Sequence, residues 1–512
     1  MIDLFGADGT DTAAPSFDRF RERYEAGEAQ LVYRRVAGDL DTPVSAYLKL
    51  AADRDDTFLL ESVEGGDQLG RYSFIGLRPD LVWRAHGDTA EINRHPEEDP
   101  DAFVQDDLGT LDSLTRLLDA SRIDVPTEMA HRLPPMAAGV FGYFGYDFVR
   151  LTEHLPHKPE DTIGLPDGYF VRPTLLAIFD NVRREVVLVT PVRVETGLDA
   201  RAAYAQATDM LADALADLRR SLPYPEPGGE LAPDFSSNMT SAAYQERVAR
   251  AKEYIRAGDI FQVVLSQRYT AEAPRDPFAV YRQLRRINPS PFLFYLAFRP
   301  GTLMGASPEI LVRVRDGEVM IRPIAGTRPR GATRDEDLAL EAELLADPKE
   351  RAEHLMLLDL GRNDVGRSSE IGSVRPTETF FIERFSHVMH IVSNVTGHLR
   401  RGVTPLQALA NGFPAGTLTG APKIRAMEII DELEPVSRGP YGGCIGYFGA
   451  DGSVDTCIGL RMAVVKDGHL HVQAGAGVVA DSDPVAEDAE CRAKAGALID
   501  AVRAAARGSG NG

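Results

Sequence analysis

Cysteine is scarce in this sequence, with only 3 among 512 residues. A disulfide-stabilised scaffold needs far more cysteine than this, so the count favours a reducing compartment. Long apolar runs are also missing, since no stretch approaches the ~18 apolar residues of a membrane span. The N-terminus has neither the basic start nor the apolar segment of a secretory signal. We therefore expect a cytoplasmic protein with no membrane partner.

Positive charge is in deficit. Lys and Arg number 56 against 77 Asp and Glu, which gives a net charge of −21. Nucleic-acid binding requires a positive field, so we expect no nucleic-acid partner. An anionic substrate would need a local positive site or a metal ion. Apolar residues make up 44% of the chain, which is enough for a large globular core.

Residues 223–229 contain three prolines and two glycines, and this composition is typical of a linker. We expect an irregular N-terminus over residues 1–30, an N-terminal region over 31–220 and a linker over 221–239. A catalytic region over 240–507 and a tail over 508–512 would follow. Short strands and longer helices are mixed without a regular βαβ repeat. This pattern favours an α+β fold with largely antiparallel sheets.

Glu353 lies in a predicted buried helix and shares a face with Leu357 and Leu360. Its carboxylate is therefore expected to enter the interior, where it needs a cation or a proton. By pattern alone, an ion pair with a residue such as Arg362 is about twice as probable as a metal.

Glu490 lies on a face with three alanines in a second predicted helix, which permits close approach of another element. If Glu353 reached the same place, the two carboxylates could hold one Mg2+ together with several waters. The alternative for Glu490 is a surface ion pair with Lys494 at i,i+4.

Three glycine-rich segments, 323–330, 413–423 and 474–479, are predicted to be turns. Backbone N–H groups in such turns bind carboxylates or phosphates, although plain turns use the same residues. Two further side chains are candidates for proton transfer. Glu309 is predicted at a junction of turn and strand, and His390 in an apolar stretch, where a structural histidine is the alternative.

Cys444 stands in a G-x-C-x-G pattern, and His95 and Glu97 mimic the partner pair of a glutaminase. The order along the chain is the reverse of that in glutamine amidotransferases. We interpret Cys444 as a structural residue, which leaves no built-in glutaminase.

Taken together, these segments resemble the chorismate-utilising enzymes, most of all those that make anthranilate. The likeness covers about residues 30–505. It is carried by the Gln262 strand and by residues 305–309, 323–331, 350–364, 413–423, 441–446, 455–461 and 475–490. The resemblance implies a large α/β sandwich of two antiparallel sheets with an N-terminal regulatory region.

The resemblance also implies a set of ligands. Mg2+ would bind at Glu353 and Glu490 and neutralise a carboxylate of chorismate. The implied substrate-binding residues are Gly326, Thr327, Thr419, Tyr441, Arg461, Gly475, Ala476, Gly477 and Lys494.

The implied chemistry has two stages. Ammonia adds at C2 of chorismate while Glu309 protonates the C4 hydroxyl that leaves; pyruvate is then eliminated with the help of His390. Isochorismate-forming relatives carry Lys at the Gln262 position, and an amide is a poor base for activating water. Aminodeoxychorismate synthases usually carry Lys at the Ala325 position, and a methyl group offers no amine nucleophile. Aminodeoxychorismate synthase component I remains the alternative enzyme.

Ammonia would come from a separate glutamine amidotransferase subunit. Leu59–Ser62 resembles the tryptophan-binding element of feedback-inhibited members, with Ser62 in contact with the ligand. Pro291, Phe292 and Leu293 resemble its second half, so tryptophan is expected to inhibit allosterically. By pattern alone, Leu59–Ser62 is a plain strand edge. A non-catalytic tryptophan-binding regulator is the second alternative.

Overall fold

The computed structural model describes residues 13–64, 68–125, 133, 136–222, 232–385 and 388–507. The expected linker segment 223–229 and the tail 508–512 lie outside the described residues, as do residues 1–12 of the N-terminus. No helix in the described part of the chain has the length and apolar character needed to cross a bilayer.

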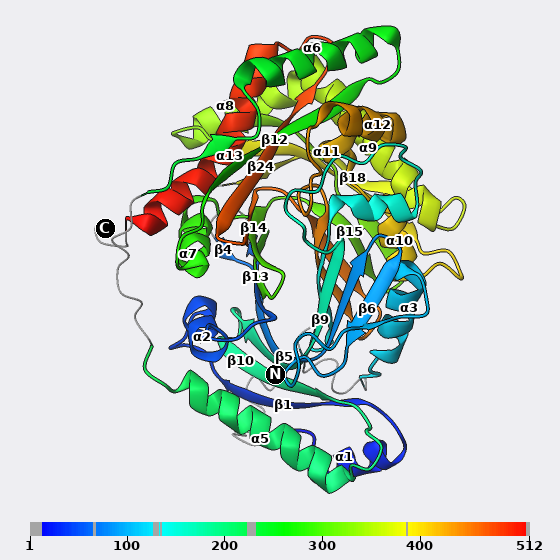
Figure 1. Ribbon diagram of the computed structural model, residues 1–512, viewed down its shortest axis with the longest axis vertical. Helices are drawn as coiled ribbons and strands as arrows, with labels where there is room; N and C mark the ends of the chain where they lie inside the picture. Colours follow the sequence, from blue (N-terminus) through cyan, green and yellow to red (C-terminus); the bar gives the residue numbers. More distant parts are fainter. Residues whose placement is uncertain are drawn as a thin grey trace.

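Two long strands, β5 (Tyr72–His86) and β9 (Gly168–Asp180), pair along most of their lengths, and an arm of paired strands extends from each (Figure 1). The first arm starts at β5 and contains β2 (Thr57–Glu61), β13 (Phe292–Phe298), β14 (Gly301–Ser307), β23 (Met462–Lys466), β24 (His469–Val478) and β12 (Gln262–Glu272). The second starts at β9 and contains β8 (Gly139–Phe144), β21 (Cys444–Gly449), β22 (Val454–Ile458), β15 (Ile310–Arg315), β16 (Glu318–Ile321) and β19 (Val388–His398).

Further strands extend these arms. They are β17 (Ile324–Pro329) and β18 (Arg375–Arg384) on β19; β11 (Ser236–Ser237) and β20 (Gly420–Ala421) on β12; β10 (Glu185–Val192) on β9 and β1 (Gln30–Ala37) on β10; and β6 (Thr89–Asn93) on β5 and β7 (Val104–Gln105) on β6. A separate hairpin joins β3 (Val63–Glu64) to β4 (Gln68–Leu69). Every one of these strand pairs is antiparallel, so the predicted antiparallel α+β fold is confirmed. The two arms, which were expected to be separate sheets, belong to one 22-stranded sheet that is joined at β5 and β9.

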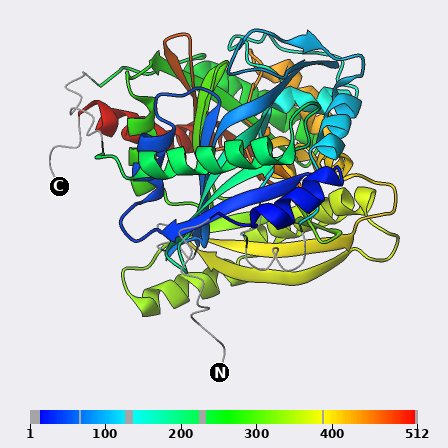
Figure 2. The ribbon, with the colours of Figure 1, turned by 90° about the horizontal axis from the view of Figure 1, so that it is seen from below.

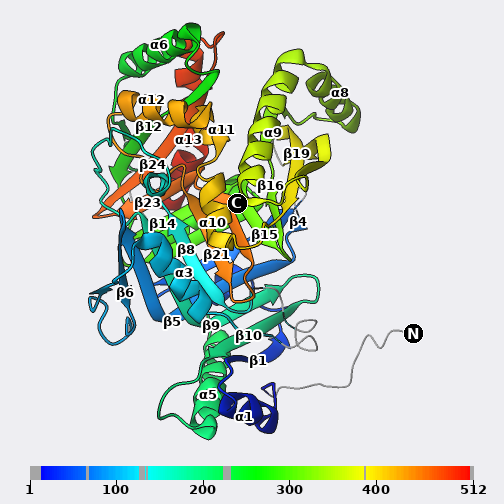
Figure 3. The same cartoon turned by 90° about the vertical axis from the view of Figure 1, so that its right-hand side faces the viewer.

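Helices pack against the strands of each arm (Figure 3). The first arm carries α6 (Ser241–Ala257), α7 (Pro277–Ile287), α12 (Lys423–Leu433) and α13 (Pro484–Ala506), and the second carries α8 (Arg334–Ala346), α9 (Pro348–Ser368) and α10 (Pro405–Gly412). The short α11 (Gly416–Thr419) contacts both α9 and β12. Elsewhere lie α1 (Phe17–Glu25), α2 (Pro43–Leu50), α3 (Thr110–Ala120), the 3-10 turn η1 (Tyr146–Leu151) and α5 (Ala200–Leu218).

The view from below shows α5 and α1 lying close to β1 (Figure 2). Strands from residues 31–220 pair with strands from 240–507, since β2 pairs with β13 and β8 with β21. The two regions on either side of the expected linker therefore build one common sheet rather than separate ones.

The apolar run Leu293–Phe298 was predicted to be a buried strand, and β13 confirms it. Leu293 and Tyr295 join the core beneath α6, α7 and α13, whereas Phe294 and Leu296 join the core between the two arms. Because both faces of this strand are buried, its sequence is apolar at nearly every position rather than alternating.

Three local expectations were wrong. Residues 474–478 lie within β24 and residues 324–329 form β17, so neither segment is a turn. The Glu353 helix is not buried all round, because Leu355 is 57% exposed. On α13 the expected alanine face is open, with Ala486 and Ala493 exposed. The α13 face that packs is instead made by Cys491, Ala495, Leu498 and Val502.

Candidate active site

Glu309 lies between β14 and β15, with only 8% of its surface exposed. The Thr417 hydroxyl lies 3.2 Å from both of its carboxylate oxygens, and the Ile324 backbone N–H also donates to it. Burial outweighs these hydrogen bonds and raises the pKa of Glu309 to about 8. At neutral pH this side chain is therefore a protonated acid that can donate a proton.

His390 lies on β19, opposite the β17 bulge at Gly326. Its Nδ1 is 2.9 Å from the Gly326 carbonyl oxygen and 3.1 Å from the Thr327 hydroxyl. A carbonyl only accepts, so Nδ1 carries the hydrogen and Nε2 keeps its lone pair. Burial lowers the pKa of His390, and the nearby Arg461 charge lowers it further. The imidazole is thus neutral near pH 7 and can accept a proton at Nε2.

Glu353 on α9 and Glu490 on α13 come from opposite arms and interact electrostatically. Burial raises the pKa of Glu353, and the charges of Glu350 and Glu490 raise it further, while Lys349 and Lys494 act in the opposite direction. The two carboxylates expected to converge are therefore neighbours in space.

Each of these two carboxylates had an ion pair as its alternative interpretation, and only one of the two pairs forms. Arg362 does not pair with Glu353; it lies 3.3 Å from Asp359 one turn earlier. The expected i,i+4 pair on α13 does form, because Lys494 Nζ lies 2.7 Å from Glu490. The same ammonium also donates to the Gly475 carbonyl at 3.1 Å.

These acidic residues suit a magnesium ion. In the described part of the chain no three His, Cys, Asp or Glu side chains form a ready-made metal cage. Mg2+ does not need one, because it is usually held by one or two carboxylates, with waters and substrate oxygens completing the shell. Two facing carboxylates, one of them with a raised pKa, form a donor set that a divalent cation would stabilise.

Arg461 lies near both the proposed base, His390, and one of the proposed metal carboxylates, Glu490. Burial lowers its pKa, and its guanidinium interacts electrostatically with Tyr441 and Glu490 as well as with His390. Glu309 joins the same region, because its backbone carbonyl accepts from Ile458 N–H, close to Arg461 in sequence. The proposed acid, base, metal carboxylates and cation thus occupy one part of the molecule.

The glycines of β24 make room for neighbouring side chains. A Cβ at Gly475 would lie 3.0 Å from Tyr441 Oη, and one at Gly477 would lie 2.9 Å from Gln262 Nε2. Gln262 is buried, and its Oε1 has no hydrogen-bond partner. An unpaired buried acceptor is costly, so this amide is poised for a ligand that donates a hydrogen bond.

The comparisons with known proteins agree with this geometry. A family model described as chorismate binding enzyme matches residues 72–500. The chain belongs to the chorismate binding enzyme family. It is 56% identical to a protein of Cereibacter sphaeroides named anthranilate synthase component 1, over 97% of this chain and all of that protein.

Solved structures of this family agree in fold. The crystal structure of anthranilate synthase component I from Streptococcus pneumoniae matches with a TM-score of 0.73 and 36% identity, over 91% of this chain and 98% of that one. The menaquinone-specific isochorismate synthase MenF of Escherichia coli matches with a TM-score of 0.68, over 95% and 98% of the two chains. At 18% identity, this second likeness shows the fold alone. The predicted family is confirmed.

The sequence analysis of this chorismate binding enzyme missed the contact between Thr417 and Glu309. It named Thr419 as a substrate-binding residue instead. The Thr419 hydroxyl is fully buried and donates to the Ala415 carbonyl at 3.0 Å. Ala476 also faces away, into the core beneath α13, so only its backbone is left for a ligand. Strand alternation, once residues 474–478 are assigned to a strand, separates Ala476 from Gly475 and Gly477.

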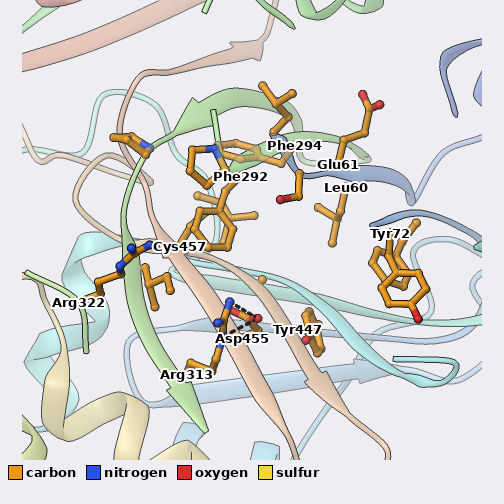
Figure 4. Close-up of a pocket in the computed structure, with 18 of the residues that line it drawn as sticks. Leu60, Glu61, Tyr72, Phe292, Phe294, Arg313, Arg322, Tyr447, Asp455 and Cys457 are labelled. Atoms are coloured by element: carbon orange, nitrogen blue, oxygen red, sulfur yellow. Dashed lines mark hydrogen bonds and ion pairs between the residues drawn. The ribbon is translucent and has the colours of Figure 1, made fainter. Parts of the chain in front are cut away.

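The four residues with an expected regulatory role, Ser62, Pro291, Phe292 and Leu293, all line one cavity of about 520 Å³ between the two arms (Figure 4). Aromatic and aliphatic side chains form much of its lining, with the ion pair of Arg313 and Asp455 on one side. This cavity is large enough for an amino acid with an aromatic side chain.

Proposed function

We propose that this chain converts chorismate and ammonia to anthranilate and pyruvate, as the synthase component of an anthranilate synthase in tryptophan biosynthesis. The observation that carries the proposal is Glu309, a buried carboxyl kept protonated up to about pH 8 inside a chorismate binding fold. The identity of 56% to a protein named anthranilate synthase component 1 supports it.

In the first stage, Glu309 delivers its proton to the C4 hydroxyl, which leaves as water while ammonia bonds to C2. Thr417 holds the carboxyl in place, since its hydroxyl reaches both oxygens. Gln262 offers an amide carbonyl rather than an amine in this region, so it can orient a donor but cannot activate water. Ala325, next to Gly326, provides no nucleophile.

In the second stage, a base removes the C2 proton as the bond between the ring and the enolpyruvyl oxygen breaks. The side chain leaves as enolpyruvate, which takes up a proton at its methylene carbon to become pyruvate. His390 suits this role because Nε2 is its free basic nitrogen and the ring is neutral near pH 7. Gly326 and Thr327 fix the ring through Nδ1. Aromatisation of the ring to anthranilate supplies the driving force.

Glu353 and Glu490 would hold Mg2+, which neutralises a carboxylate of chorismate when bound. Arg461, Tyr441 and Lys494 supply the remaining positive charge and hydrogen bonds for the second carboxylate. This arrangement allows a protein with a net charge of −21 to bind a dianion.

Ammonia is proposed to come from a separate glutamine amidotransferase subunit. Burial raises the pKa of the Cys444 thiol to about 12, so this cysteine is inert as a glutaminase nucleophile. The three cysteines are free thiols, and this supports the proposed cytoplasmic location. Tryptophan is proposed to bind the cavity lined by Ser62 and Phe292 and to inhibit turnover.

The test is direct. The purified chain is incubated with chorismate, Mg2+ and ammonium chloride, and products are separated with fluorescence detection. Fluorescent anthranilate together with pyruvate is the expected result. A stable 4-amino product would instead identify an aminodeoxychorismate synthase. No turnover, combined with tryptophan binding, would identify a non-catalytic regulator.

A further inference from the structure

A buried ion pair joins Arg438 to Glu434, the residue that follows α12. Arg438 Nη2 and Nε lie 2.5 and 2.9 Å from the two carboxylate oxygens, and the two side chains are only 1% and 3% exposed. Glu434 also accepts from the backbone N–H and the hydroxyl of Ser266 on β12, at 2.8 and 2.9 Å. A buried ion pair contributes little stability over an apolar pair of similar volume, so stability alone does not account for it.

The other hydrogen bonds of the Arg438 guanidinium end on two main-chain carbonyls. Nη1 donates to the Leu418 carbonyl and Nη2 to the Val264 carbonyl, both at 2.7 Å. Leu418 belongs to α11 and Val264 to β12, so one side chain ties these two elements together. The last carbonyls of a helix have no partner inside it, so a short helix such as α11 depends on outside donors. Leu418 directly follows Thr417, whose hydroxyl lies 3.2 Å from both carboxylate oxygens of Glu309.

The same guanidinium lies over two tyrosine rings. Its central carbon is 4.9 Å from the ring centroid of Tyr146 and 5.7 Å from that of Tyr441, within range of a cation–π contact. The Tyr441 backbone N–H also donates to the Arg438 carbonyl at 3.3 Å. Arg438 therefore holds Tyr441, one of the residues proposed to bind chorismate, by its ring and by its main chain.

Arg438 itself is not available to a ligand, because it is buried and the bonds above use four of its five N–H groups. We propose that Arg438 is a positioning residue, which fixes Thr417 and Tyr441 for the first stage of the reaction. This inference rests on the proposed function. If α11 shifts, the Thr417 hydroxyl leaves Glu309, and the acid loses the orientation in which it donates to the departing hydroxyl.

Three variants test this role. Arg438→Lys keeps a positive charge beside Glu434, but a lysine ammonium lacks the planar fork and cannot serve the carboxylate and both carbonyls in their present directions. Thr417→Val removes the hydroxyl that holds the proposed acid and leaves every bond of Arg438 in place. Arg172→Lys is the matched control, because Arg172 on β9 forms a two-point ion pair with Asp80 and belongs to no part of the proposed site.

We expect Arg438→Lys to lower kcat with ammonium at least ~10-fold. The Thr417 hydrogen bond lowers the pKa of Glu309, so its loss should also move the alkaline midpoint, the pH at which kcat falls to half, upwards by at least ~0.5 unit. Thr417→Val should move this midpoint in the same direction, and Arg172→Lys should keep the wild-type kcat and midpoint. A loss of stability alone would reduce the amount of active protein without moving the midpoint.

The double variant Arg438→Lys/Thr417→Val shows whether the two residues act together. If Arg438 acts through Thr417, kcat of the double variant should match that of Thr417→Val within ~3-fold. A loss equal to the product of the two single effects, or an unchanged alkaline midpoint in Arg438→Lys, would overturn the proposal. If Arg438→Lys does not fold, Tyr146→Leu loosens the guanidinium without unpairing either charge. An unchanged midpoint in Tyr146→Leu would then overturn the proposal, and an upward shift would support it.

Wild-type protein is assayed in parallel. If it makes anthranilate while Arg438→Lys keeps the wild-type midpoint, the positioning role alone fails. If the wild type makes no anthranilate, the proposed function fails and the positioning role falls with it.

Discussion

The phenyl ring of Phe385 lies against the imidazole of His390, with ring centroids 5.4 Å apart and planes at 64°. Phe385 also lines the 520 Å³ cavity, as do Pro308 and Ile310, the two neighbours of Glu309 in sequence. A ligand in that cavity would therefore contact residues adjacent to both the proposed acid and the proposed base. If tryptophan binds there as proposed, these contacts give it a short physical route to the active site.

The first prediction concerns tryptophan. Phe292→Ala removes an aromatic wall of the cavity and should raise the tryptophan concentration for half-inhibition about 10–150-fold, because an aromatic contact of this kind contributes roughly 1.5–3 kcal/mol. Phe261→Ala is the control, since that ring is 70% exposed and outside the cavity lining. Unchanged inhibition in Phe292→Ala would place the tryptophan site elsewhere.

The second prediction is the pH dependence of turnover. Glu309 donates a proton, and its pKa is about 8, so kcat should fall as pH rises through that value. Glu309→Gln should reduce kcat by at least ~100-fold. A wild-type rate that stays constant to pH 10 would remove Glu309 from the proton-transfer step.

The same variant should be more stable above neutral pH. A raised folded-state pKa means that the native state holds its proton while the unfolded state ionises. Glu309 therefore costs stability increasingly from about pH 4.5 to about pH 8. Glu309→Gln removes that cost, so its Tm should exceed the wild-type Tm at pH 8 and match it near pH 4. Thermal melts at the two pH values measure this difference.

The third prediction concerns the metal. Glu353→Gln and Glu490→Gln should each increase the Mg2+ concentration needed for half-maximal activity by at least ~10-fold, because each removes one of the proposed ligands. Asp359→Asn, an exposed change on the same helix as Glu353, should leave the Mg2+ dependence as it is. Identical Mg2+ titrations for all three variants would exclude this pair as the metal site.

The fourth prediction separates the two stages. His390→Ala should still aminate chorismate but eliminate pyruvate slowly, so the aminated, non-aromatic intermediate should accumulate. His398→Ala, at the exposed far end of β19, should form anthranilate at the wild-type rate. Chromatography of quenched reactions distinguishes the two products. Absence of the intermediate together with normal anthranilate formation would show that His390 is structural.

Local patterns predicted some elements well and others poorly. The all-apolar β13 was identified because burial on both faces leaves a continuous hydrophobic run. Residues 474–478 were mistaken for a turn because glycine is typical of turns. In β24 these glycines instead admit Tyr441 and Gln262, and β12, which pairs with β24, lies about 200 residues earlier. A contact of this kind leaves no local signal.

The sequence by itself determined the family, the antiparallel α+β class and the acidic residues that we propose for the chemistry, because residue type and short-range spacing are local properties of the chain. Only the tertiary structure decided that Arg461 reaches His390, Tyr441 and Glu490, that Thr417 rather than Thr419 supports Glu309, and that Arg438 ties α11 to β12. Those relationships depend on how distant strands and helices pack, and packing is fixed by the whole core rather than by any one segment.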